Sequence, residues 1–154
     1  MLVVFSSLQK IVKSIDTMVE SHVNSGFLST HLRYGIQNEK LYNYIIVLND
    51  QKRKMCNLKV IVENALDCLP QTQRELLCLR YIEKKTFQEI SELTSVCIRT
   101  VFRRYDSAIE NFERALKHAG YTEKWIEGEY GDMAIIKTIK ERLKNSTYLT
   151  KTNI

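Results

Sequence analysis

Apolar residues recur at every third or fourth position in the first part of the chain. Residues 2–23 show this spacing at Leu8, Ile11, Val12, Ile15, Met18, Val19 and Val23. A segment with one apolar face predicts an amphipathic helix. The sequence "NSG" at residues 24–26 follows, and because Asn and Gly tolerate a helix C-terminus, the helix is expected to end there. The pattern of residues 27–37 is ambiguous.

Residues 39–66 contain neither glycine nor proline and predict one long helix. Counting in sevens from Leu41 gives a seam of a and d positions that is apolar except at Gln51. The other members of the seam are Tyr44, Leu48, Met55, Leu58, Val62 and Ala65. This pattern is typical of a coiled coil with one polar register point. Its partner is either a second copy, which would give a homodimer through 39–66, or the first helix of the same chain.

Three shorter helices are predicted between residues 67 and 118. Residues 67–70 interrupt the long helix, and Pro70 suits the first position of the next one. Thr86 and Glu89 then form a capping box at the start of a short helix with Phe87, Ile90 and Leu93 on its inner face. After a turn at residues 94–95, a second helix begins at Cys97 and ends near Gly120. Its buried side is expected to carry Val101, Tyr105, Ala108, Ile109 and Phe112.

The opposite side of this second helix is a candidate DNA-reading face. Helical geometry places Arg99, Arg103 and Asp106 outward, with Thr100, Arg104 and Ser107 on the flanks. An arginine can bind the O6 and N7 atoms of guanine together or hold a phosphate.

The segment "LPQTQRELLCLRYIEKKTFQEISELTSVCIRTVFRRYDSAI", residues 69–109, resembles region 4 of the sigma-70 family. The pattern is matched at Leu69, Pro70, Arg74, Leu79, Arg80, Tyr81, Thr86, Phe87, Glu89, Ile90, Leu93, Val96, Thr100, Val101 and Arg104. Two positions depart from it, because Ser95 stands where the turn usually has glycine and Cys97 stands where the recognition helix usually opens with Ser or Thr.

This resemblance implies a helix-turn-helix that binds promoter DNA and engages host RNA polymerase. Arg99, Thr100 and Arg103 would face base edges, and Arg104 and Ser107 would lie closer to the DNA backbone. Lys85 and Thr86 would hold phosphate. The family pattern supports Thr86, Thr100 and Arg104, whereas Arg99 and Arg103 come from helical geometry. Residues 1–66 lack the aromatic-rich melting domain of a full sigma factor, so the arrangement resembles small phage late transcription regulators of the ArpU type.

The remaining residues, 119–154, are expected to form a turn-rich connection, one short helix and a loose tail. Asp132 is placed to cap this helix, which carries Ile135, Ile136, Ile139 and Leu143. The whole chain is therefore predicted to be all-α. It divides into a helical N-terminal region at 1–66, a helix-turn-helix domain at 67–118 and a C-terminal region at 119–154.

Composition narrows the class of function. A single proline and five glycines favour helices over strands, and a net charge of +5 permits a nucleic-acid partner. The four cysteines and three histidines have no metal-ligand spacing, and no phosphate loop or nucleophilic triad is present. We therefore expect no enzyme activity, cofactor or metal, and free thiols in the cytoplasm. No segment is long and apolar enough to span a membrane.

Two other classes of protein share these features. A small terminase-like DNA-packaging subunit also combines a helix-turn-helix with a helical oligomerisation segment, and it would form rings with a partner ATPase. A helical protein-interaction adaptor would show no salt-dependent affinity for DNA.

Overall fold

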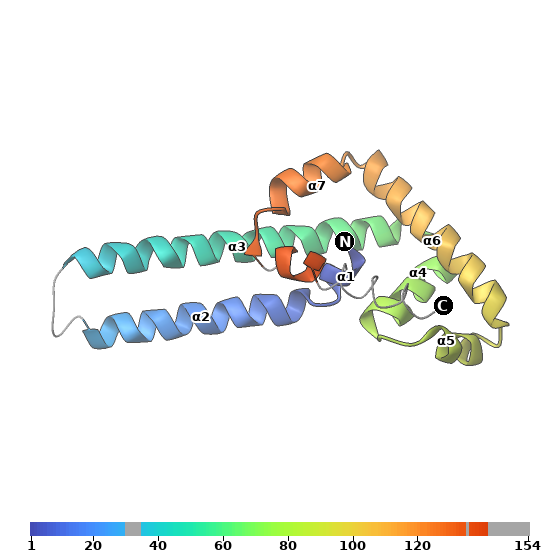
Figure 1. Ribbon diagram of the computed structural model, residues 1–154, viewed down its shortest axis with the longest axis horizontal. Helices are drawn as coiled ribbons and strands as arrows, with labels where there is room; N and C mark the ends of the chain where they lie inside the picture. The colour runs from blue at the N-terminus through green and yellow to red at the C-terminus, as the bar shows by residue number, and fades with distance from the viewer. Residues whose placement is uncertain (30–34, 135, 142–154) are drawn as a thin grey trace. The chain divides into compact units, whose positions relative to one another are not determined.

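The computed structural model describes residues 1–29, 35–134 and 136–141, and within these residues it contains helices and no strand (Figure 1). This confirms the predicted all-α class. The elements are α1 (Leu2–Phe5), α2 (Leu8–Ser29), α3 (Gly35–Asp67), α4 (Gln71–Leu77), the π-helix η1 (Cys78–Ile82), α5 (Phe87–Thr94), α6 (Ile98–His118) and α7 (Glu123–Tyr130). Residues 134 and 136–141 are also helical.

The chain divides into two compact units, one formed by residues 5–60 and the other by residues 1–4 together with 61–154. The boundary falls inside α3. The unit of residues 5–60 is called the hairpin unit below, and the other is called the helix-turn-helix unit.

In the hairpin unit, α2 pairs with the first part of α3. Leu8, Ile11 and Ile15 of α2 are buried, as are Leu48, Met55 and Leu58 of α3. The Nζ of Lys52 lies 2.6 Å from the Oδ1 of Asp16 and joins the two helices at their polar edge. The heptad seam of residues 48–58 is therefore covered from within the chain, which is the second of the two partners that the pattern left open.

The predicted end of the first helix at residues 24–26 is wrong. The chain stays helical through Gly26 to Ser29 and breaks instead between α1 and α2. A glycine inside a helix costs only about 1 kcal/mol, which a helix of this length can absorb.

The core of the helix-turn-helix unit is built by α4, α5 and α6. Leu76, Ile90 and Val101 are buried together, and the half-buried side chains around them are Leu79, Phe87, Val96 and Tyr105. The hydroxyl groups of Tyr81 and Tyr105 lie 2.7 Å apart and link η1 to α6. The predicted inner faces of α5 and α6 are thus largely those observed.

Leu93, which was expected on the inner face of α5, is exposed, and so is Ile82 of η1. Leu93 is 61% exposed because α5 turns its Phe87 side towards α6, where the Phe87 ring contacts Phe102 and Tyr105. Ile82 is 51% exposed because η1 winds with a wider turn, in which the N–H of Glu83 donates to the carbonyl of Cys78, and this shifts the helical phase. Pro70 stands at the N-cap of α4, one position before its first helical residue.

The C-terminal region contains a helix that the sequence did not predict. The helix α7 lies inside the segment that was expected to be a turn-rich connection, and the hydroxyl of Thr122 caps it by accepting from the N–H of Trp125 at 3.3 Å. In the next helical segment Ile136 is buried and Asp132 pairs with Lys137, and the cap at Asp132 stays a prediction. Ile135 and Leu143 lie outside the described residues.

The turn between α5 and α6 depends on Ser95, which adopts a left-handed conformation with φ 53°. The N–H of Val96 donates to the carbonyl of Ser91 at 3.1 Å, and the Ser91 hydroxyl donates back to the carbonyl of Val96 at 2.7 Å. These bonds fix the direction in which α6 leaves the turn.

We expect Ser95→Gly to raise the free energy of unfolding by about 0.5–1 kcal/mol, as measured by urea denaturation. A side chain in the left-handed region costs about 1–2 kcal/mol, and the added entropy of glycine in the unfolded chain removes only part of that gain. Gln88→Gly, in the first turn of α5, is the matched control and should lower the same free energy by up to about 1 kcal/mol. A loss of stability in Ser95→Gly would contradict the strain argument.

Leu48→Lys and Met55→Lys should each destabilise the hairpin unit by more than about 3 kcal/mol, since they place a charge at buried positions. Circular dichroism melts combined with light scattering measure both helix content and mass. Ile46→Lys, on the same helix but 64% exposed, should melt like the unmodified protein. A fully helical monomer in place of a dimer, after either buried substitution, would instead support the intermolecular seam.

Candidate nucleic-acid interface

The start of α5 is fixed by the predicted capping box. The N–H of Thr86 donates to Oε2 of Glu89 at 2.7 Å, and the N–H of Glu89 donates to Oγ1 of Thr86 at 3.2 Å. The Thr86 hydroxyl also donates to the same carboxylate at 2.9 Å. Hydrogen bonds from the backbone and side chain of Thr86 hold the pKa of Glu89 below its usual value. The Thr86 hydroxyl is thus engaged beside a negative charge, and its contact with phosphate stays a prediction.

The segment that leads into α5 is held by Arg80. Its guanidinium donates to the carbonyl of Lys85 at 2.8 Å and lies 4.6 Å from the centre of the Phe87 ring. The N–H of Lys85 donates to the carbonyl of Leu79 at 3.0 Å. These contacts give the Lys85 backbone a fixed position at the entry to the helix-turn-helix, with its side chain half-buried.

Cys97 occupies the N-cap position of α6, and its side chain makes no capping hydrogen bond. Its Sγ lies 3.1 Å from the Oγ1 of Thr100, and this contact is the main reason that the pKa of Cys97 is lowered. Thr100 is therefore half-buried against the start of its own helix, on the flank of the outward face. Its contact with a base edge stays a prediction.

The outward face of α6 carries the arginines. Arg99 and Arg103 are exposed one helical turn apart, opposite the buried Val101 and Ala108. Within the described part of the chain, Arg99, Arg103 and Arg104 form no ion pair. Their charge is therefore available to an anionic partner.

A polar groove lies between α4 and α6 on the flank of this face. It has a volume of about 380 Å³ and is lined by Thr72, Gln73, Arg103, Arg104 and Ser107. Two hydrogen bonds join the helices here, because the Gln73 amide donates to the Ser107 hydroxyl at 3.3 Å and accepts from the Asn111 amide at 2.9 Å. The structure thus brings together three of the predicted site residues, Arg103, Arg104 and Ser107, in one groove.

Thr72 and Gln73 were not among the residues predicted from the sequence. Their polar side chains near the start of α4 carried no signal of their own, since solvent-facing polar residues are common at such positions. Only the packing of α4 along α6 places them beside the two arginines.

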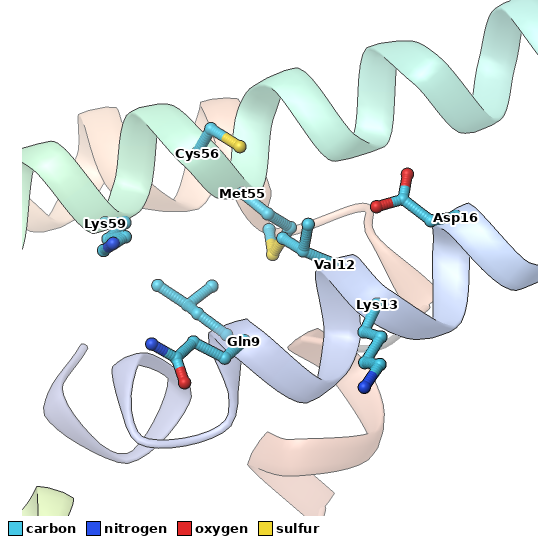
Figure 2. A pocket seen from close by; sticks show the side chains of 8 residues that line it. Gln9, Val12, Lys13, Asp16, Met55, Cys56 and Lys59 are labelled. Carbon is cyan, nitrogen blue, oxygen red and sulfur yellow. The ribbon is translucent and has the colours of Figure 1, made fainter.

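A second hollow, of about 260 Å³, lies within the hairpin unit between α2 and α3 (Figure 2). Gln9 and Val12 of α2 lie opposite Met55 and Lys59 of α3, and the walls are mostly apolar. The carboxylate at its edge, Asp16, is already paired with Lys52. This hollow lacks the converging polar groups of a catalytic site.

The described residues also lack two other kinds of feature. They contain no group of three or more His, Cys, Asp or Glu side chains placed to hold a metal ion. None of the helices in the described ranges is long and apolar enough to cross a bilayer.

Comparison with known proteins identifies a family that part of the chain resembles. No curated protein sequence matches the chain significantly. No solved structure does so either. Residues 59–108 match the family described as "Sigma-70, region 4", which covers about a third of the chain, from the last turns of α3 to Ala108 in α6. The helix-turn-helix with its exposed arginines lies inside this match, so this part of the chain is similar to the region-4 module of sigma factors.

Proposed function

We propose that this protein is a sequence-specific, DNA-binding transcription regulator that places α6 in the major groove. The observation that carries the proposal is the pair of exposed arginines, Arg99 and Arg103, on the outward face of a helix-turn-helix similar to sigma region 4. The groove admits an α-helix, and arginine is the side chain most often used there to bind guanine. Residues near the start of the second helix reach base edges in this motif.

The phosphate contacts come from the flanks of the same surface. Arg104 and Ser107 line the groove beside α4, together with Gln73, and are placed to hold one DNA strand. Lys85 and Thr86 lie at the start of α5, where the Lys85 charge and the helix dipole favour an anion beside the Glu89 carboxylate of the capping box. Such contacts fix the position of the protein on the duplex without reading its sequence.

The proposed regulator acts with host RNA polymerase and is encoded by a phage or prophage, in the manner of ArpU-type late regulators. Similarity to region 4 supports the polymerase contact, since sigma factors work as part of that enzyme. The protein has no catalytic role in this proposal. It regulates transcription through the position at which it binds on DNA.

Binding of the full chain to genomic fragments of its source, titrated across salt, tests the proposal. Enrichment of a promoter-containing fragment, with an affinity that falls steeply as salt rises, is the expected result, because each phosphate contact releases counterions. Binding that does not depend on salt or sequence would favour the protein-interaction adaptor. Ring formation with a partner ATPase would favour the packaging subunit.

Arg103→Glu should lower the affinity for the enriched fragment at least tenfold, since it replaces a base-reading cation with an anion. Electrophoretic mobility shift measures the loss, and circular dichroism should show unchanged helix content and melting, because the side chain is exposed. Lys124→Glu, an exposed position on α7, makes the same change of charge and serves as the control. Equal binding by Arg103→Glu and the unmodified protein would remove α6 from the interface.

A further inference from the structure

Two large apolar side chains of α6 lie at the border between its buried side and its outward face. Ile98 is 40% exposed and Phe102 is 44% exposed. In a helix of 3.6 residues per turn, positions 98, 99, 102, 103 and 106 share one continuous arc. The two apolar residues therefore border the proposed reading face, about 100° around the helix from Arg99 and Arg103.

The Phe102 ring is held in place from one side. Its centre lies 4.6 Å from that of Phe87, and Phe87 in turn contacts the Tyr105 ring edge-on at 5.0 Å. The guanidinium of Arg80 covers the same Phe87 ring at 4.6 Å. One part of the Phe102 ring is thus packed, and the other part faces solvent in a fixed orientation. A ring fixed in this way loses little conformational entropy when it binds.

Ile98 and Phe102 are called the apolar strip below. The charges around this strip indicate what kind of partner binds to it. Arg99, Arg103 and Arg104 favour a polyanion, and the apolar partner must therefore belong to a polyanion. The major groove of DNA offers one apolar group, the 5-methyl group of thymine, and phenylalanine is among the side chains that contact it.

We propose that Phe102 and Ile98 read thymine methyl groups in the major groove, next to the bases bound by Arg99 and Arg103. This inference rests on the proposed function and adds specificity-determining residues to it. One helical turn rises 5.4 Å, which spans between one and two base-pair steps of about 3.4 Å. The preferred site therefore contains thymine within about two base pairs of the guanine bound by an arginine.

The test removes the methyl group and leaves the protein unchanged. A binding site is first selected from random duplexes with the full chain. Each thymine is then replaced in turn by deoxyuridine, which lacks only the 5-methyl group. We expect one or two adjacent replacements to weaken binding about fourfold each, the effect of exposing one buried methyl group. Replacements elsewhere in the site should have no effect.

Protein variants identify the side chain that contacts each thymine whose methyl group matters. In Phe102→Ala the deoxyuridine effect should disappear at one position, and in Phe102→Leu part of it should remain. Leu93→Ala is the control, because Leu93 is more exposed but lies on α5. Melting curves check that Phe102→Ala keeps its fold despite the lost contact with Phe87.

Each result leads to a different conclusion. Specific binding with no thymine sensitive to methyl removal would overturn the inference and leave the proposed function standing. Methyl sensitivity that persists unchanged in both Phe102→Ala and Ile98→Ala would assign the readout to other residues and overturn it as well. Absence of any specific DNA binding would overturn the proposed function and the inference together, and would make the apolar strip a protein-binding surface.

Discussion

The packing of Ile90 between Leu76 and Val101 is the contact on which the rest of the helix-turn-helix unit depends. Ile90 is completely buried, although α5 is a short helix with one fully buried side chain. Removing it would leave α5 with its capping box, its turn and only the half-buried Phe87 as an apolar contact with the core. The angle between α5 and α6 decides which residues of α6 face outward. The exposed arginines and the apolar strip beside them are therefore both positioned by this small core.

Local signals made much of this unit predictable from the sequence. Thr86 and Glu89 identify the start of α5, and the spacing of Val101, Ala108 and Phe112 identifies the buried side of α6. Features set by tertiary packing were not predictable. The exposure of Leu93 follows from the way α5 rolls towards α6, and Gln73 joins the site only because α4 lies along α6.

For the long helix α3, too, the sequence alone did not determine the packing. Its heptad pattern predicts a seam, of which Leu48, Met55 and Leu58 are buried whereas Tyr44 is 40% exposed. A pattern of apolar positions does not specify which helix lies along such a seam. In the structure Leu8 and Val12 of α2 line one hollow with Met55 of α3 within the same chain. The helix α7 was not predicted, because the local sequence signals pointed to turns. Gly128 and Gly131 suggest turns, whereas the cap at Thr122 and the aromatic contact of Trp125 with Tyr130 stabilise a helix.

The positive charge on the exposed face of α6 is concentrated in its first turns. Arg99, Arg103 and Arg104 lie there, whereas the later turns mix the acidic Asp106, Glu110 and Glu113 with the basic Arg114 and Lys117. Glu113 is also paired with Lys117 at 2.7 Å. On the proposed function the attraction to phosphate therefore comes from the N-terminal turns, because the later turns carry little net charge. The base pairs that α6 can read are thus limited to those within reach of its first turns.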